Sequence, residues 1–404
     1  MKFSNRKTLS FFLLLTIYLI PILGLIDFLI SVGILDGVSE RSRSSNPYPY
    51  IIVIKEILAL LIFLYLALIA IKEGKISKIS YILIIFISFL TVNASSIESV
   101  VAGVRESVGL VYISLGVYVI RAMYAFQEDK VFLLKFIRAI KIIFLIEFIM
   151  TLVQIKYMPG YEGLTMLGSR VIGSFTNPNT VGVFSVIGLL TLYMFKDLIK
   201  VHKVYYIMSL FMVLASGSRT ALILLLLLYF YIGVSIKSYS HVKVLYLLFV
   251  FFISIVILLN INYFSSKPQG LSLINSVRVD NLVSYVNSTN FLEFILGNGW
   301  GTNTSWHRFL SGEQDTLPPL DSFVAAMIYQ IGIIGTILLY IVLGIVFSFA
   351  GSKGKFLYIM FVLIGGQINI LEYYPISFMI FILVGLIIGI NSCQAKGLEK
   401  INYE

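Results

Sequence analysis

The sequence predicts an all-α polytopic membrane protein with about twelve transmembrane helices. Of its 404 residues, 59% are hydrophobic and only 12% are charged, and the mean hydropathy is +0.96. A water-soluble domain of this composition would expose large apolar patches. Apolar runs of roughly 17 to 25 residues recur along the chain, and each is long enough to cross about 30 Å of hydrocarbon as a helix.

The predicted transmembrane segments are these runs, separated by short polar gaps. They cover residues 10–33, 50–71, 79–95, 103–120, 136–156, 179–195, 204–217, 219–236, 243–264, 322–349, 356–371 and 375–391. No internal repeat and no linker rich in Pro or Ser divides the chain. The sequence therefore predicts a single membrane domain over residues 1–404. The first apolar run is too long for a cleaved signal sequence, so we expect it to be a retained span.

The formal net charge of +10 comes from Lys and Arg residues, which lie mostly in the polar gaps between the apolar runs. Most Lys and Arg residues fall in alternate gaps and near both termini, as the positive-inside rule requires of cytoplasmic segments. This assignment places both termini in the cytoplasm and two long loops, residues 157–179 and 265–321, on the outer side. A basic groove with interleaved aromatic residues is absent from the sequence, so we expect no nucleic-acid partner.

Arginine is the commoner cation on the predicted outer side beyond the first loop. The residues there are Arg105, Arg170, Arg219, Arg278 and Arg308, against Lys55, Lys156 and Lys267. The planar guanidinium group binds phosphate in a bidentate way, which suits a phosphate-bearing substrate. Anchoring to the phosphates of lipid headgroups is the alternative for each of them.

Two short segments combine an arginine with the start of a predicted helix. Arg219 lies between two apolar runs with almost no loop, so its charge is close to the hydrocarbon and needs a partner or a water-filled cavity, unless it is an interfacial anchor. Asn177, Pro178 and Asn179 precede another run, where Asn179 or the following threonine fits a helix cap. The same helix start, with Arg170 nearby, also fits an anion site.

In their order along the chain, these pieces resemble the Wzy O-antigen polymerase and O-antigen ligase superfamily. The resemblance covers about residues 160–340. Its pieces are Arg170 with Gly173, Asn177-Pro178-Asn179, Ser218-Arg219-Thr220, Phe294-Ile295-Leu296-Gly297-Asn298-Gly299-Trp300-Gly301, Leu320-Asp321-Ser322-Phe323 and Gly332-Ile333-Ile334-Gly335. Their succession is more telling than any single piece.

The resemblance implies a GT-C-like membrane glycosyltransferase in the bacterial inner membrane, with the two long loops in the periplasm. Its substrates would be donor and acceptor oligosaccharides on undecaprenyl pyrophosphate, joined without metal or cofactor. Arg170, Arg219 and Arg278 match the family's outer-loop arginines, and we expect Asn177 and Asn179 to help bind the pyrophosphate. Membrane lipid and a chain-length regulator protein are the other partners that the resemblance implies.

Ligases of this superfamily usually carry a histidine-asparagine pair where the long loop enters the next helix. Asp321 and Ser322 stand there instead, which favours a polymerase over a ligase. A polysaccharide flippase or transporter is the alternative of another class. Asp321 is the first candidate for the base that receives the acceptor's proton, and His307 is the second. Asp321 also fits a helix cap, and His307 fits a surface position.

Further patterns have mainly structural interpretations. The glycines of Gly297-x-Gly299-x-Gly301 predict a turn, because no βαβ unit surrounds them. Gly385 and Gly389 predict close helix packing within the bundle. Trp300 and Trp306 fit sugar stacking or an interfacial aromatic belt. Asp27, Lys55, Glu56 and Glu147 lie in apolar runs, a pattern that suggests ion coupling, but Lys55 and Glu56 are close to a predicted membrane edge, which disfavours it.

Overall fold

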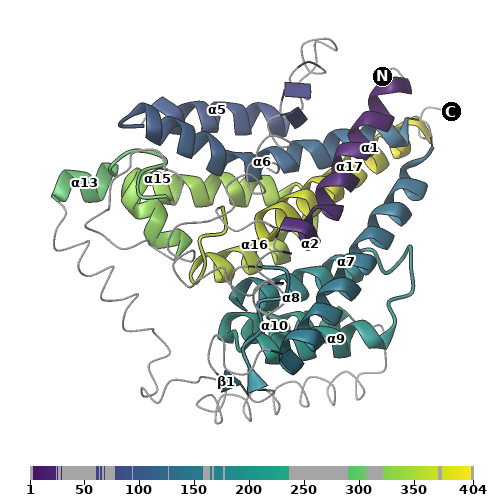
Figure 1. Cartoon of the computed structure of the whole chain (residues 1–404). Coiled ribbons are helices and arrows are strands. Elements are labelled where there is room, and N and C mark those ends of the chain that lie inside the picture. Colours follow the sequence, from purple (N-terminus) through teal and green to yellow (C-terminus); the bar gives the residue numbers. More distant parts are fainter. Residues whose placement is uncertain are drawn as a thin grey trace. The chain divides into compact units, whose positions relative to one another are not determined.

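The computed structural model describes residues 3–23, 25, 29, 61–62, 64–65, 68, 78–92, 94–125, 127–157, 164–165, 168–175, 178–235, 290–304, 307, 322–371 and 375–401. This part of the chain is mainly helical, as the sequence predicts (Figure 1). A short ribbon is the exception, in which β1 (Leu164–Thr165) pairs antiparallel with β2 (Gly168–Ser169).

The helices follow the apolar runs closely. In chain order they are α1 (Phe3–Tyr18), α2 (Ile20–Leu23), α5 (Lys78–Val92), α6 (Ile97–Tyr124), α7 (Asp129–Tyr157), α8 (Pro178–Met194), α9 (Lys203–Ser216), α10 (Arg219–Ser235), α13 (Phe291–Leu296), α15 (Phe323–Ser348), α16 (Gly351–Gly365) and α17 (Ile376–Ile401). Each predicted segment in the described part overlaps a helix. The predicted segment 243–264 and most of 50–71 lie outside the described residues.

Three of the described helices are long and apolar enough to cross a membrane. These are Ile97–Tyr124, Phe323–Ser348 and Ile376–Ala395. Shorter apolar helices are Ser10–Ile22, Ser80–Val92, Pro178–Met194, Lys203–Ser216 and Arg219–Ser235. A helix of about 17 residues rises only roughly 25 Å, which is less than the hydrocarbon thickness. The membrane-crossing character is thus found in part of the chain, and the count of about twelve spans stays a prediction.

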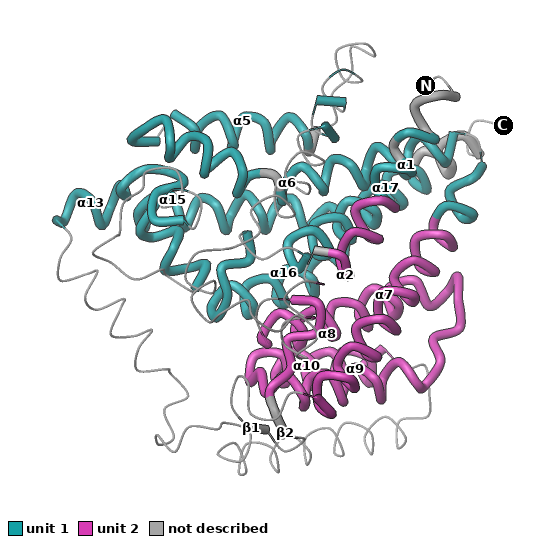
Figure 2. The backbone as a smooth tube through the Cα atoms, viewed as in Figure 1, with its two compact units in different colours: residues 1–13, 53–132, 272–404 teal, residues 14–52, 133–271 magenta. Residues whose placement is uncertain are grey.

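The chain divides into two compact units, drawn in different colours in Figure 2. Unit 1 consists of Met1–Leu13, Val53–Phe132 and Ser272–Glu404, and unit 2 of Leu14–Ile52 and Leu133–Leu271. Unit 1 therefore contains α5, α6 and the helices from α13 onward, whereas α8, α9, α10 and most of α7 belong to unit 2. The single membrane domain expected from the sequence stays a prediction.

Small residues allow α6 and α17 of unit 1 to pack closely. A Cβ atom added at Gly385 would meet the carbonyl oxygen of Ile113, and one at Gly389 would lie 2.8 Å from the Cβ of Ile120. Such approaches leave no room for a side chain on α17, a common device where helices associate in membranes. The predicted packing role of both glycines is confirmed.

The helix α15 is interrupted at Gly332, where φ is 68° and ψ is 177°. A loop segment of the same unit lies against this break. The amide of Asn298 donates to the carbonyl oxygen of Tyr329 at 2.9 Å, and the amide of Gly299 donates to that of Gln330 at 2.8 Å. Backbone groups released by a helix break need partners inside a membrane protein, and the loop supplies them here.

The same loop carries Trp300 into the core of unit 1. Gly297, Gly299 and Gly301 have φ values of 83°, 111° and 84°, so the predicted glycine turn is confirmed. Trp300 is fully buried, and a Cβ atom added at Gly103 of α6 would overlap its indole ring. The expected role in sugar stacking or an interfacial belt is wrong for Trp300, because its ring packs inside the protein. Trp306 lies outside the described residues.

Helix α8 is the centre of unit 2. Every residue of this helix except Asn179 is buried. A Cβ atom added at Gly188 would lie 2.8 Å from the ring of Phe144 on α7, and one at Gly182 would lie 2.7 Å from the Cβ of Ala221 on α10. Because α8 is covered on several sides, its apolar composition is used for packing within the protein.

Candidate functional site

Several helix ends of unit 2 meet around the loop of residues 170–175. The amide of Val171 donates to the carbonyl oxygen of Ala215 at 3.2 Å, at the end of α9. Helix α10 begins directly after the turn that ends α9. Gln154, near the end of α7, accepts from the amide of Ile172 at 3.0 Å. The loop thus contacts the end of α9 and residues of α7, next to the turn after which α10 begins.

Arg170 connects two of these helix ends through its side chain. Its Nε donates to the carbonyl oxygen of Ser216 at 2.9 Å, and its Nη2 donates to Oδ1 of Asn179 at 3.3 Å. The last carbonyls of a helix have no partner within the helix and attract positive charge. Arg170 therefore satisfies the end of α9 and holds it beside the first turn of α8.

Asn179 does not cap α8, contrary to the prediction. The helix begins one residue earlier, at Pro178, whose fixed φ suits the first turn and whose missing N–H costs nothing there. Asn179 and Thr180 are consequently inside the helix, and the Asn179 side chain is instead the acceptor for Arg170. Asn177, which the sequence also assigns to the site, lies outside the described residues.

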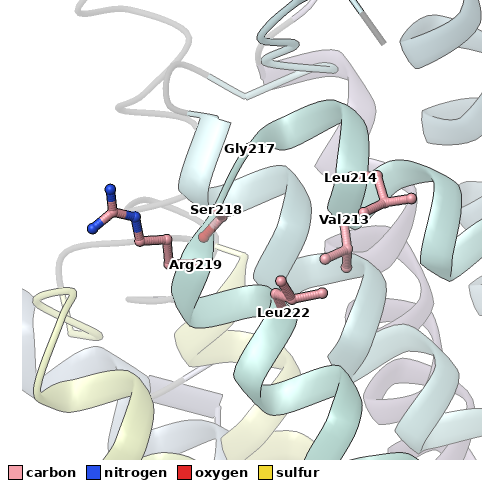
Figure 3. Close-up of a pocket in the computed structure, with 6 residues that line it drawn as sticks. All are labelled: Val213, Leu214, Gly217, Ser218, Arg219 and Leu222. Carbon is pink, nitrogen blue, oxygen red and sulfur yellow. The ribbon is translucent and has the colours of Figure 1, made fainter. Parts of the chain in front are cut away.

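Arg219 is the first residue of α10 and follows a tight turn. Gly217 adopts the left-handed conformation that commonly ends a helix, with φ 61° and ψ 20°. A small hollow at this turn is lined by Val213, Leu214, Gly217, Ser218, Arg219 and Leu222 (Figure 3). The lining is mainly apolar, and the guanidinium group of Arg219 points away from it. The hollow itself is therefore not a phosphate site.

The turn between α9 and α10 nevertheless brings two arginines together. Ser216, which ends α9, accepts the hydrogen bond from Arg170, and Arg219 follows three positions later. Arg170 and Arg219 are 49 positions apart in the sequence, so only the fold places both at one turn. Both side chains carry a permanent positive charge.

The backbone amides of the loop are occupied within unit 2. Gln154 Oε1 accepts from the amide of Gly173 at 2.8 Å, and Gln154 Nε2 donates to its carbonyl oxygen at 3.1 Å. Glu147 accepts from the amide of Ser174 at 3.0 Å and from its hydroxyl group. The amide of Phe175 donates to a carbonyl of the same loop. An anion at the start of α8 therefore cannot use the amides of residues 171–175.

Glu147 and Gln154 are the residues of this site whose role sequence reasoning missed. Both are fully buried on α7. Glu147 was a candidate for ion coupling, and Gln154 had no assigned role. Their spacing could have drawn attention to them, because polar residues seven positions apart on an apolar helix lie on the same face. That spacing predicts a common polar partner, although it does not say which segment provides it.

The remaining predicted site residues belong to unit 1 or to undescribed stretches. Arg278 and Asp321 lie outside the described residues, so their assigned roles in the site stay predictions. The cap position expected of Asp321 is wrong, because Ser322 is the residue that precedes α15 as its N-cap. His307 is described: its amide donates to Oγ1 of Thr304 at 3.0 Å. Its Nδ1 is buried and has no hydrogen-bond partner within the described part of the chain. His307 is therefore half-buried, and the expected surface position is only partly correct.

Unit 1 contains a second set of buried, hydrogen-bonded polar residues, centred on Gln330 of α15. Gln330 Oε1 accepts from the amide of Gly301 at 3.0 Å, and Gln330 Nε2 donates to Oε1 of Glu106 at 3.4 Å. Both side chains are almost completely buried. These contacts attach the glycine turn to α6 and α15 close to the break at Gly332. No sequence pattern pointed to either Glu106 or Gln330.

The described part of the chain thus defines a helical protein with three helices able to cross a membrane and an arginine pair at one turn of unit 2. Within that part, no group of three or more His, Cys, Asp or Glu side chains is placed to hold a metal ion. Comparison of the chain with protein-family models, with curated proteins and with solved structures found no match.

Proposed function

We propose that this protein is a surface-polysaccharide polymerase of the O-antigen polymerase kind, with a GT-C-like membrane fold of about twelve spans. It would join oligosaccharide repeat units carried on undecaprenyl pyrophosphate at the periplasmic face of the bacterial inner membrane. Both termini would lie in the cytoplasm, and the loops 157–179 and 265–321 in the periplasm. The proposal extends the resemblance of the sequence to that superfamily.

The arrangement of Arg170 and Arg219 is the observation that carries the proposal. Both belong to the motifs of the resemblance. The side chain of Arg170 reaches the end of α9 at Ser216, and Arg219 begins α10 after the turn. Arg170 is held by Ser216 and Asn179, so its position is fixed before any substrate binds. Fixed cations stabilise charge that develops in a transition state without the cost of rearranging at that moment.

In glycosyl transfer, the two arginines would stabilise the charge of the leaving group. An oxygen of the acceptor sugar forms a bond to the anomeric carbon of the donor glycan, while the bond from that carbon to the pyrophosphate breaks. The pyrophosphate leaves with the bonding electrons, and its negative charge is stabilised by Arg170 and Arg219. The proton of the acceptor hydroxyl goes to a base, for which Asp321 and His307 are the candidates from the sequence.

The apolar helices support a substrate with a lipid carrier. Helices such as Phe323–Ser348 and Ile376–Ala395 are suited to a hydrocarbon environment. A polyprenyl chain stays in that environment, while its pyrophosphate and sugars remain at the surface. A protein with two arginine residues beside one turn of an apolar helical unit is therefore suited to bind the charged part of such a lipid.

A flippase or transporter is the second candidate, because one observation favours it. Transporters commonly contain interrupted helices with polar groups nearby, and α15 is interrupted at Gly332 next to the buried Glu106 and Gln330. However, the carbonyls of Tyr329 and Gln330 at this break already accept from the loop amides. A loop anchor explains these contacts without a transported substrate. A ligase that moves glycan to a different acceptor is a third possibility, which Asp321-Ser322 disfavours.

The test is deletion of the gene in its source strain, followed by complementation and gel separation of the surface polysaccharide. A polymerase predicts that the deletion strain displays single repeat units and that the wild-type gene restores a ladder of long chains. A flippase predicts instead that surface glycan disappears and lipid-linked repeats accumulate on the cytoplasmic side. A ligase predicts long chains that stay on the carrier lipid. Either of the last two patterns would reject the polymerase.

A further inference from the structure

We propose that Glu147 and Gln154 are positioning residues that hold the arginine-bearing loop, residues 170–175, in the conformation that brings Arg170 to the end of α9. The proposal rests on the proposed function for its catalytic consequence. The positioning itself rests only on the geometry of unit 2. The positioning and its effect on catalysis can therefore be tested separately.

The first step is that side chains of α7 accept the hydrogen bonds of the loop's backbone amides, as backbone carbonyls do in a helix or a sheet. Three consecutive loop amides, those of Ile172, Gly173 and Ser174, all donate to side chains of α7. The loop is buried, so each of these amides would be destabilising without a hydrogen-bond partner. Two side chains on one helix therefore determine the course of the loop.

The second step is that the loop shape fits these side chains closely. Gly173 has φ 57°, which side-chain-bearing residues rarely adopt. A Cβ atom added there would lie 2.7 Å from Oε2 of Glu147 and 3.0 Å from Cγ2 of Val181. The absence of a side chain at Gly173 thus allows the carboxyl group to reach the amide of Ser174.

The third step connects this anchor to Arg170. Only Val171 separates Arg170 from the loop residues held by α7, and the amide of Val171 donates to the carbonyl oxygen of Ala215. A loop fixed on both sides has little freedom to move the guanidinium group. Since a displacement of about 1 Å can lower a rate by about 100-fold, releasing the loop should impair a reaction that uses Arg170.

The test compares Glu147→Leu with Glu147→Gln in the full-length protein in lipid nanodiscs. The glutamine amide can accept from the amide of Ser174 through its oxygen and donate to the Ser174 hydroxyl group through its nitrogen, so it preserves the anchor. Leucine has a similar size and preserves neither bond. Gln154→Leu provides the same loss at the second anchor point, and Ser174→Ala is a milder variant if either leucine variant does not fold.

Thr151→Val is the matched control. Thr151 is fully buried on α7 between the two anchors, and its hydroxyl group donates to the carbonyl oxygen of Glu147 within the same helix. The substitution therefore removes a buried hydroxyl group from α7 without removing a bond to the loop. It should change neither the loop nor the activity.

Two measurements separate the outcomes. Hydrogen exchange of the peptide that contains residues 170–175 should become faster in Glu147→Leu and Gln154→Leu and stay at the wild-type rate in Glu147→Gln and Thr151→Val. The rate of glycan elongation should fall by about 100-fold in the same two leucine variants, with a smaller change in KM. Unchanged exchange in both leucine variants overturns the positioning role. Faster exchange together with full activity of Arg170→Ala supports the positioning and rejects the role of Arg170 in catalysis.

Discussion

The Nε atom of Arg170 donates to the carbonyl oxygen of Ser216 at 2.9 Å, across 46 positions of sequence. This contact joins the loop before α8 to the end of α9, three positions before Arg219. It also offers a purely structural reason for Arg170, because a cation stabilises the C-terminal end of a helix by about 0.3–1 kcal/mol. Tests of Arg170 must therefore separate helix stability from action on a substrate.

The first prediction concerns charge and geometry at the arginine pair. Arg170→Lys and Arg219→Lys keep the positive charge and lose the planar fork, whereas the alanine variants lose both. Removing one such group should lower elongation by about 100-fold to 1,000-fold and leave glycans one repeat long. If the lysine variants fail as well, the fork is required. The measurement is the glycan ladder of complemented cells at matched protein levels.

Lys203→Ala is the control for this series, because Lys203 begins α9 and is exposed at the end of that helix opposite to Ser216. Thermal unfolding of the purified variants then reports stability independently of activity. Long ladders from the stably folded alanine variants of both arginines would contradict the proposed pyrophosphate site.

The second prediction concerns the side of the membrane on which the arginine pair lies. Cys393 is the only cysteine of the chain, so its replacement by serine gives a background free of thiols. A cysteine at Thr220, next to Arg219, should react with an impermeant maleimide in spheroplasts. A cysteine at Lys203 should react only after the membrane is opened. The reverse pattern would place the turn in the cytoplasm and exclude periplasmic chemistry there.

The third prediction concerns Gly173, which the anchor on α7 requires to be a glycine. Gly173→Ala should destabilise the protein by about 1–3 kcal/mol, because the backbone conformation is unfavourable for alanine and the added Cβ meets Glu147. Gly366→Ala is the comparison: Gly366 has φ −63°, and a Cβ atom added there would lie 3.6 Å from the carbonyl oxygen of Leu363. Equal unfolding temperatures for the two variants would argue against strain at Gly173.

The fourth prediction concerns the contact between Trp300 and Gly103 in unit 1. Trp300→Ala should cost about 3–5 kcal/mol because a large buried ring is lost. Gly103→Ala should also destabilise, since the added methyl group overlaps the indole ring. The double variant should be less unstable than the sum of the two, because the smaller side chain at residue 300 leaves room for the methyl group. Additive free energies of unfolding would show that the two residues do not pack together.

Much of the fold can be predicted from the sequence, because apolar runs and polar gaps report where helices begin and end. The start of α10 at Arg219 and the glycine turn around Trp300 are examples. The burial of Trp300 was not predictable, since an aromatic residue in a polar loop usually remains at the interface. The start of α8 was misplaced by one to two residues because Pro178 favours the first turn over an extended approach.

The candidate site was predictable only as a list of residues. Arg170, Arg219 and Asn179 follow from the motifs. The placement of Arg170 at the end of α9, however, depends on a hydrogen bond to the backbone carbonyl of Ser216, which no side-chain pattern records. Glu147 and Gln154 could have been recognised as a polar pair on one face of α7. Their partners could not, because they are mainly backbone amides of the loop, which no side-chain pattern records.

The sequence by itself determined that this protein is helical and strongly apolar, because hydrophobic runs of that length bury themselves only in lipid or in one another. It also determined which arginine residues are candidates for the proposed phosphate site. Only the tertiary structure decided that Arg170 meets the end of α9, that α7 fixes the loop before α8, and that Trp300 is a core residue. These features depend on contacts between residues far apart along the chain, whose geometry is set when the helices pack.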